Sequence, residues 1–372
     1  MTTHADTTGS QADTAYPQAD TRTAQADTWS AQTDTSPAQT DTKARKPTCE
    51  SDKPTQSSLG PCNTRSMSNI RRAAVAVLAG PALLAACAPS SPVASLADAT
   101  PGQRAWAAAC EDSDSWDKPG PPFRIYGNTY YVGTCGITAL LVDGDTGLTL
   151  LDTGTQKGAE IVLANIDALG FQRAEIGTIL MSHEHFDHVG GIARVQDATG
   201  ATILTTRDAG QVLRSGKPGA GDPQAASGHP AFPGATGKID WLGDWNARLL
   251  GGERFTPIAT PGHTPGATSW QWRSCEGSDC KSIVYVDSLN PISAEGYRFA
   301  DHPELVAAMR AGIAKVAAAD CDIVIAPHPV AVNWRRRLLG EAPLVDRGGC
   351  RAFAATATER LDKRLASERA GG

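Results

Sequence analysis

The sequence predicts an α/β protein whose globular part, residues 105–372, is a four-layer αββα sandwich. Two observations lead to this fold class. Apolar strand-like runs alternate with Gly-rich turns and helix-like segments from about Ala105 onward, and the second half repeats the order of the first, strands followed by a helix. Alternation alone also fits a doubly wound α/β fold with one parallel sheet. The motifs along the chain must therefore decide between the two.

The first half contains "ITALLVDGDTGLTLLDTG", which predicts two strands joined at an Asp-Gly turn. "KGAEIVLANIDALG" has apolar residues at helical spacing and stops at Gly170, a typical helix C-cap. A short strand, Thr178–Met181, leads into "SHEHFDH", so this histidine-rich segment is expected on a strand-to-helix loop. "GGIARVQDATG" predicts the following helix and "ATILTT" another strand.

The second half opens with short strands in "DWLGDWNARLLGGERFTPIATPGHTPGATSWQW", interrupted by a loop. "SIVYVDSL" predicts a buried strand, "HPELVAAMRAGIAKVAAAD" a helix, and "CDIVIAPHP" a strand that ends at His328. The last segment, "CRAFAATATERLDKRLASERA", is amphipathic and carries charges of both signs. Each half thus has the same order of elements, as two similar halves of a sandwich require.

The first 87 residues differ in composition from the rest. Residues 1–66 hold almost no large aliphatic side chains and repeat an Ala-Asp-Thr unit, so we expect a disordered or untranslated leader. Residues 67–87 have the order of a secretory signal peptide: two arginines, an apolar run too short to span a bilayer, and small residues. "LAAC" at its end resembles a lipobox and predicts a lipid anchor at Cys87. The alternative is an ordinary small residue near a signal-peptidase site.

These features predict translation from Met67, export to the periplasm and, through Cys87, anchoring to the outer membrane. The cysteines agree with export, because six of the nine lie in the globular part, an even number that suits an oxidising compartment. "CEGSDC" can close a small bridge between Cys275 and Cys280, whereas Cys110, Cys135, Cys321 and Cys350 allow three pairings. The formal charge of −6 gives no sign of a nucleic-acid binder.

The segment "SHEHFDH" predicts a metal centre. His183, His185, Asp187 and His188 can converge on one point from a loop, which they cannot do from a single strand or helix. His263, in "IATPGHTPGATSW", and His328, in "IVIAPHPVAVNW", follow apolar runs in the same way. Six nitrogen and oxygen ligands suffice for two Zn²⁺ ions with three protein ligands each and open positions for water.

The alternatives for these histidines are solvated loop residues and a structural zinc site. A structural zinc site is normally closed by four ligands and rich in thiolate, and this cluster holds no cysteine. His4, His229 and His302 lack convergent partners and are predicted to be surface residues. Asp152, at a strand end, is expected to organise the loop from a buried position; the alternative is that it reaches the metals.

"HEHFDH", followed by "PGHTPG" and a late histidine, resembles the metallo-β-lactamase superfamily, whose members share the αββα fold. "YVDSL" and "CDIVIAPHPVAVNW" are similar to its subclass B3, particularly the disulfide-rich secreted members. The resemblance implies that the first zinc is held by His183, His185 and His263, and the second by Asp187, His188 and His328. It implies substrate contacts by Ser288, Asn290 and Tyr297. It also implies the disulfides Cys110–Cys135, Cys275–Cys280 and Cys321–Cys350.

The implied activity is zinc-dependent hydrolysis of the β-lactam amide bond in penicillins, cephalosporins and carbapenems. A hydroxide between the two metals attacks the carbonyl, and Asp187 orients it. The resemblance further implies a monomer. One alternative is a thioester or lactone hydrolase of the same superfamily, in which Asp287 bridges both metals; otherwise Asp287 is a buried carboxylate that accepts backbone hydrogen bonds. A second is a zinc-binding surface lipoprotein without catalysis.

Overall fold

The computed structural model describes residues 99–371. The predicted leader, the signal peptide with its lipobox at Cys87, and His4 lie outside the described residues. Among residues 99–371, no helix combines the length and the hydropathy needed to cross a bilayer. The folded part starts with helix α1 (Pro101–Ala109), ahead of the predicted boundary at 105, and a capping box between Thr100 and Gln103 begins this helix.

The first sheet has seven strands in the order β1-β2-β3-β4-β5-β6-β7. Strands β1 to β4 are antiparallel neighbours, whereas β4 to β7 are parallel. The strands are β1 (Phe123–Tyr126), β2 (Thr129–Tyr131), β3 (Leu140–Gly144), β4 (Gly147–Leu151), β5 (Ile176–Leu180), β6 (Thr202–Thr205) and β7 (Ile239–Trp241). The predicted hairpin is confirmed as β3 and β4, which pair from Leu140 and Leu151 to Gly144 and Gly147.

The second sheet has five strands in the order β12-β11-β10-β9-β8. Only β11 and β12 are parallel neighbours in it. The strands are β8 (Arg248–Leu250), β9 (Glu253–Ala259), β10 (Thr268–Glu276), β11 (Asp279–Tyr285) and β12 (Ile323–Ile325). Two separate sheets exclude the doubly wound alternative, which has one.

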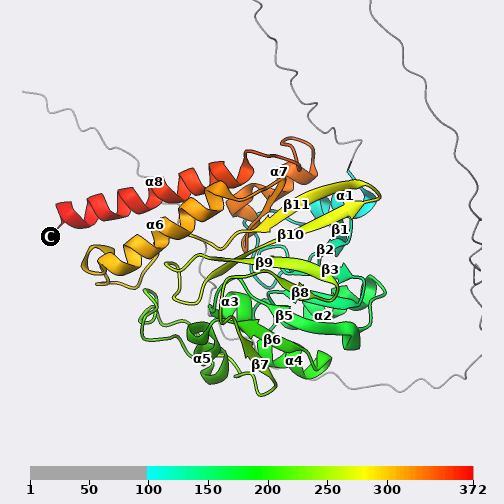
Figure 1. Ribbon diagram of the computed structural model, residues 1–372, viewed down its shortest axis with the longest axis horizontal. Coiled ribbons are helices and arrows are strands. Elements are labelled where there is room, and N and C mark those ends of the chain that lie inside the picture. The colour runs from blue at the N-terminus through cyan, green and yellow to red at the C-terminus, as the bar shows by residue number, and fades with distance from the viewer. Residues whose placement is uncertain (1–98, 372) are drawn as a thin grey trace, which may run out of the picture. The chain divides into compact units, whose positions relative to one another are not determined.

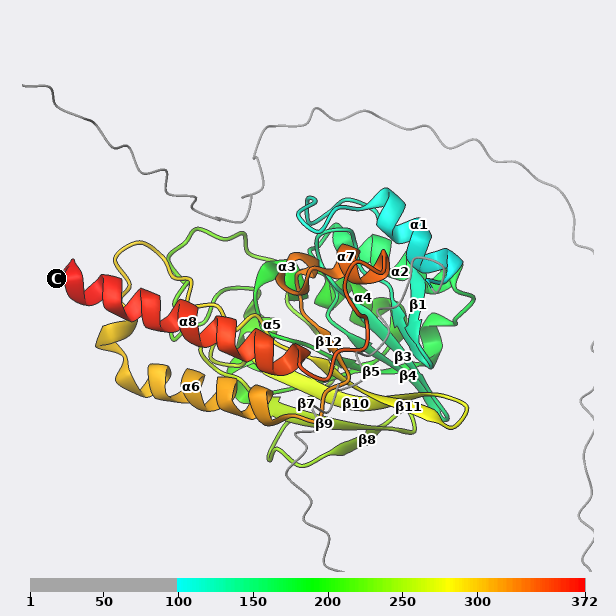
Figure 2. The same ribbon diagram turned by 90° about the horizontal axis from the view of Figure 1, so that it is seen from above.

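Helices cover the outer faces of both sheets. The α-helices after α1 are α2 (Gly158–Ala168), α3 (Phe186–Val189), α4 (Ile192–Thr199), α5 (Arg207–Ser215), α6 (Pro303–Ala318), α7 (Trp334–Leu338) and α8 (Gly349–Ala370). Short 3-10 helices are η1 (Arg173–Glu175), η2 (Phe299–Asp301) and η3 (Pro329–Val332). Figure 1 shows α2, α4 and α5 on the side of the first sheet, and Figure 2 shows α6 and α8 together on the side of the second.

Alternation along the strands of the first sheet explains the layers. Leu141 and Leu150 pack against the buried residues of α2 and α4, whereas their neighbours Leu140 and Leu151 belong to the core that contains Trp270 of the second sheet. Successive side chains of a strand point to opposite faces, so a strand buried on both faces is apolar throughout. The predicted four-layer αββα sandwich is confirmed.

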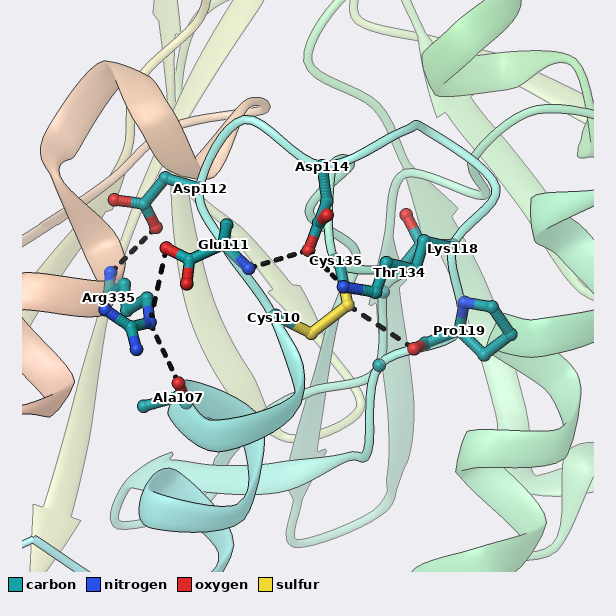
Figure 3. The surroundings of a disulfide bond; sticks show 12 residues. Ala107, Cys110, Glu111, Asp112, Asp114, Lys118, Pro119, Thr134, Cys135 and Arg335 are labelled. Atoms are coloured by element: carbon teal, nitrogen blue, oxygen red, sulfur yellow. Dashed lines mark hydrogen bonds and ion pairs between the residues drawn. A yellow bond between two sulfur atoms is a disulfide. The ribbon is translucent and has the colours of Figure 1, made fainter.

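Three disulfides tie loops to this framework: Cys110–Cys135, Cys275–Cys280 and Cys321–Cys350. These are the pairs that the resemblance implies. Figure 3 shows the first of them beside the loop that follows α1, where Asp112 accepts a hydrogen bond of 2.8 Å from the backbone N–H of Arg335. The loop of residues 110–120 is thereby attached to the segment between β2 and β3 and to α7.

Candidate metal centre

The segment "SHEHFDH" starts on the loop after β5 and ends inside α3, to which Asp187 and His188 belong. The prediction that one loop carries all four candidate ligands is therefore wrong for these two residues. A buried carboxylate holds the segment in place. Asp152, at the end of β4, accepts hydrogen bonds from the backbone N–H and the hydroxyl of Ser182, both at 2.7 Å. The hydroxyl of Tyr285 donates a third at 2.6 Å. Asp152 is fully buried and has a positive φ of 60°. Its contacts are those of a residue that organises the loop.

Three histidines form the first group of candidate ligands. Ligand atoms of His183, His185 and His263 lie within 4.8 Å of one another, and all three side chains are buried. His183 and His185 come from the loop after β5, whereas His263 lies on the loop between β9 and β10. The sequence places these residues far apart, and the edge of the two sheets brings them together.

One nitrogen of each of these rings is occupied by a neighbour. Nε2 of His185 lies 3.1 Å from Asp222 Oδ2, and Nδ1 of His263 donates to the carbonyl oxygen of Asn290 at 2.8 Å. Nδ1 of His183 lies 3.0 Å from Asp287 Oδ1. Such contacts orient metal-binding imidazoles and leave the second nitrogen for the ion. Nε2 of His183 is buried and has no hydrogen-bond partner among residues 99–371.

Asp187, His188 and His328 form the second group. His188 Nε2 lies 3.0 Å from Asp187 Oδ2 and 3.2 Å from His328 Nε2, and His328 Nε2 lies 3.4 Å from Asp187 Oδ2. Ligands at about 2.0–2.1 Å from a tetrahedral zinc lie about 3.3 Å from one another. The three atoms therefore have the spacing of zinc ligands. His188 Nδ1 lies 3.5 Å from Asp152 Oδ2, which orients the ring.

The two groups are adjacent, since the rings of His183 and His188 have centroids 4.2 Å apart. Burial lowers the pKa of His263 to about 3 and that of His328 to about 4, and it also lowers the pKa of His183. These imidazoles are neutral at pH 7, the form that binds a metal. Burial also opposes the charge of Asp187, but the nearby His188 outweighs it and the pKa of this carboxyl is lowered.

The predicted substrate residues lie on the segment after β11. Ser288 and Asn290 are half-buried, and the backbone of Asn290 contacts His263. The ring of Tyr297 stacks on His302 at a centroid distance of 4.6 Å and also packs against Phe299. The structure therefore brings Asn290 to the candidate ligand His263 and places the Tyr297 ring against His302, which is exposed as predicted.

His229 is half-exposed, but the prediction that it lacks partners in the cluster was wrong. Its ring lies beside the metal-binding segment, with centroids 5.8 Å from His185 and 5.3 Å from Phe186, and its Nδ1 is buried. The cause is Asp222, whose bond to His185 draws the Gly- and Pro-rich loop of residues 216–236 over the cluster. A loop without periodic apolar residues gives no sequence signal for such a contact.

Sequence reasoning also missed three neighbours of the ligands. Trp116 lies with its ring centroid 5.9 Å from His328 and 5.6 Å from Phe186. Asp222 orients His185, and Glu184 is a buried carboxylate between two candidate ligands. The only available signal was for Glu184, because an acidic residue inside a predicted buried segment requires a partner.

Comparisons with known proteins agree with this arrangement. The family model of the metallo-β-lactamase superfamily matches residues 132–275. The solved MIM-2 metallo-β-lactamase is 49% identical, with a TM-score of 0.69, covering 73% of this chain and 99% of that one. For MIM-1 from Novosphingobium pentaromativorans the identity is 45% and the TM-score 0.68, covering 72% and 99%. MEM-A1, a subclass B3 enzyme from a soil metagenome library, is 40% identical with a TM-score of 0.65, covering 69% and 100%.

A curated relative matches over a shorter stretch. A UPF0173 metal-dependent hydrolase from Anaeromyxobacter dehalogenans (strain 2CP-C) is 31% identical over 94 residues, which are 25% of this chain and 29% of that protein. The match thus spans under a third of that hydrolase.

The αββα sandwich with histidine and aspartate ligands at the edge of its two sheets defines a class of metal-binding hydrolases. Within this class, the chain belongs to the metallo-β-lactamase superfamily and to its subclass B3.

Proposed function

We propose that this protein hydrolyses the amide bond of β-lactams, with penicillins, cephalosporins and carbapenems as substrates, and so confers antibiotic resistance. The observation that carries the proposal is the pair of adjacent ligand groups, His183, His185 and His263 beside Asp187, His188 and His328. The solved β-lactamases that resemble the chain over nearly their whole length support it.

The two groups suit two zinc ions, one per group. Nitrogen and carboxylate ligands without thiolate are a donor set that zinc accepts, and three protein ligands leave a position open for water. When bound, zinc lowers the pKa of a coordinated water to about 7 and polarises a carbonyl oxygen. The orphaned Nε2 of His183 fits this assignment, because a buried polar atom without a partner is otherwise costly.

The side chains of this protein supply orientation and charge. Asp187 stays ionised because its pKa is lowered, so its carboxylate can accept a hydrogen bond from the attacking water and hold it toward the substrate. Ser288 and Asn290 offer hydrogen-bond donors for the substrate carboxylate, and the hydroxyl of Tyr297 is the third candidate donor. Trp116, which lies beside His328, adds an apolar surface near the same ligands.

A thioester or lactone hydrolase is not favoured. That alternative requires Asp287 to bridge two metals. Asp287 instead faces Nδ1 of His183, and its second oxygen accepts a hydrogen bond from the backbone N–H of Leu289 at 3.2 Å. In this position it orients a ligand. A zinc-binding lipoprotein without catalysis is also not favoured. Each ligand group has three members, which leaves a coordination position on each ion for water or substrate.

The cellular location of the enzyme and its oligomeric state are also proposals. We infer that residues 67–87 direct export to the periplasm and that Cys87 carries a lipid anchor to the outer membrane. The three disulfides support an oxidising compartment. The catalytic domain acts as a monomer on small-molecule substrates.

The test compares substrate classes on one protein sample. The full chain is purified, its zinc content is measured, and hydrolysis of a cephalosporin, a thioester and a lactone is followed under the same conditions. The proposal expects two zinc ions per chain and turnover of the cephalosporin at a kcat/KM at least 100 times that for the other two. A chain with two zinc ions that cleaves only the thioester or the lactone would refute it.

A further inference from the structure

Glu184 lies between His183 and His185 in the sequence, yet its side chain points to a different loop. It is 3% exposed, and its carboxylate contacts the segment of residues 260–266, which carries His263. We propose that Glu184 is a positioning residue that joins the two loops of the three-histidine group and thereby sets the zinc affinity of that site alone. The inference rests on the proposed two-zinc centre.

Both carboxylate oxygens of Glu184 are used. The hydroxyl of Thr264 donates to Oε2 at 2.5 Å, and the backbone N–H of Gly266 donates to Oε1 at 2.8 Å. Thr264 is fully buried, so these bonds are shielded from water. The donors are 80 and 82 residues away in the sequence, so one side chain connects two otherwise separate segments. His263 is the immediate neighbour of Thr264.

The loop that receives these bonds has little freedom to move away. A Cβ atom at Gly266 would lie 2.5 Å from Cβ of Ala209, and one at Gly262 would lie 2.6 Å from Cγ of Met309. The loop is therefore pressed against α5 on one side and α6 on the other. Asn290 holds the His263 ring itself, and Glu184 bonds the backbone segment next to it to the segment that carries the other two histidines. The position of His263 relative to His183 and His185 thus depends in part on this carboxylate.

The second ligand group, Asp187, His188 and His328, does not depend on Glu184 for its position. In this group, His188 Nδ1 lies 3.5 Å from Asp152 Oδ2, and His328 lies on the segment after β12. None of these ligands lies on the loop of residues 260–266. Loss of the Glu184 bonds is therefore expected to weaken one zinc site and spare the other. Mutating a group that orients a metal ligand typically lowers metal affinity about 10- to 100-fold.

The variants follow from the hydrogen bonds. Glu184→Ala removes both acceptors. Glu184→Gln keeps an oxygen for Gly266 N–H and offers an amide N–H to the Thr264 hydroxyl, so it is expected to restore most of the affinity. Thr264→Val removes one bond and leaves the carboxylate. Thr260→Val is the matched control, because this buried threonine lies on the same loop but pairs with the hydroxyl of Ser269 at 3.1 Å.

The experiment measures stepwise zinc dissociation constants of the full chain by competition with a chromogenic chelator, without substrate, and the melting temperature of each zinc-free variant. We expect Glu184→Ala to lower the zinc affinity about 10- to 100-fold at one site and less than threefold at the other. Thr264→Val should lower it less, and Glu184→Gln and Thr260→Val should have zinc affinities near those of wild type. This selectivity distinguishes positioning from general destabilisation, which lowers both affinities together.

The inference is overturned if Glu184→Ala leaves both zinc dissociation constants unchanged or raises both by the same factor. If that variant does not fold, Thr264→Val is the deciding variant. Two zinc dissociation constants equal to those of wild type would then overturn the inference. The proposed function fails separately, because a wild-type chain that binds two zinc ions without cleaving β-lactams refutes the activity and leaves the zinc measurements valid. A wild-type chain without zinc at the three-histidine group overturns both.

Discussion

The Nε2 atoms of His188 and His328 lie 3.2 Å apart, although 140 residues separate them in the sequence. His188 lies in α3, which follows β5 of the first sheet, and His328 follows β12 of the second. Two acceptor nitrogens at this distance repel each other unless a cation or proton lies between them. The two sheets thus meet at an edge where these nitrogens share either a proton or a metal ion, and Asp187 Oδ2 lies next to both nitrogens.

Asp187→Asn tests the role of this carboxylate. The amide is a weaker metal ligand and a poorer acceptor for the attacking water, so we expect kcat for a cephalosporin to fall about 100-fold or more. The fold should change little, because the carboxylate contacts only His188 and His328 in the described part of the chain. Steady-state kinetics and the melting temperature measure the two effects. Full activity with two zinc ions bound would show that the assigned role is wrong.

Asp152→Ala is expected to destabilise the fold. The change leaves three buried donors without their acceptor, the backbone N–H and hydroxyl of Ser182 and the hydroxyl of Tyr285. Each unsatisfied group costs about 1–3 kcal/mol, so we expect a loss of about 3–5 kcal/mol in the free energy of unfolding. Urea titration of the zinc-free protein measures it. Asp143→Ala, on the exposed end of the same hairpin, is the control and should change stability by less than about 0.5 kcal/mol.

The residues of the site that follow from local spacing in the sequence were predictable. His183, His185, Asp187 and His188 are predictable because they lie within six positions of one another, on the loop after β5 and in α3, and His263 and His328 follow recognisable strands. Asp222, Glu184 and His229 were not predictable, since their contacts join segments far apart in the chain through irregular loops. Nothing in the residue types around them indicates which distant donor they meet.

The fold likewise has elements that the sequence predicts and elements that it does not. The hairpin of β3 and β4 and the helices α2 and α6 follow from alternation, helical spacing and turn residues. Helix α1 was not predicted, although its buried Trp106 packs on Tyr131 with ring centroids 5.5 Å apart. Its apolar face consists of one tryptophan among alanines, which is too weak a periodic signal to recognise.

Glu368 makes stability depend on pH. Burial opposes its charge, but bonds from Arg364 and from the backbone N–H groups of Ala300 and Phe299 outweigh burial and lower its pKa. A lowered pKa in the folded state means that the stabilisation is present at neutral pH and is lost as the pH falls below the ordinary glutamate value. The carboxylate therefore stabilises the contact between α8 and η2 mainly above about pH 4.

Glu368→Gln measures this effect. We expect the variant to be about 1–3 kcal/mol less stable than wild type at pH 7 and the difference to shrink toward pH 3. Denaturant unfolding at both pH values provides the comparison. Glu359→Gln, an exposed position on the same helix, should show no such dependence. A difference between Glu368→Gln and wild type that is equal at pH 7 and pH 3 would contradict the assignment.

The disulfides are expected to stabilise unequally. Cys321–Cys350 closes a loop with a sequence separation of 29 and joins the segment before β12 to α8, whereas Cys275–Cys280 closes one of 5 at the end of a hairpin. Loop entropy predicts a loss of about 3–4 kcal/mol when both cysteines of the first pair become alanine and about 2 kcal/mol for the second. Melting temperatures of the two double variants test the order, and a larger loss for the hairpin pair would refute it.

The most direct test of zinc-dependent β-lactam hydrolysis uses a carbapenem and a cephalosporin with the purified chain, with and without a zinc chelator. We expect cleavage of both substrates, loss of cleavage when the chelator removes the metal, and recovery when zinc is added back. Cleavage that persists after the zinc has been removed, or no cleavage by a chain that carries two zinc ions, would contradict this expectation.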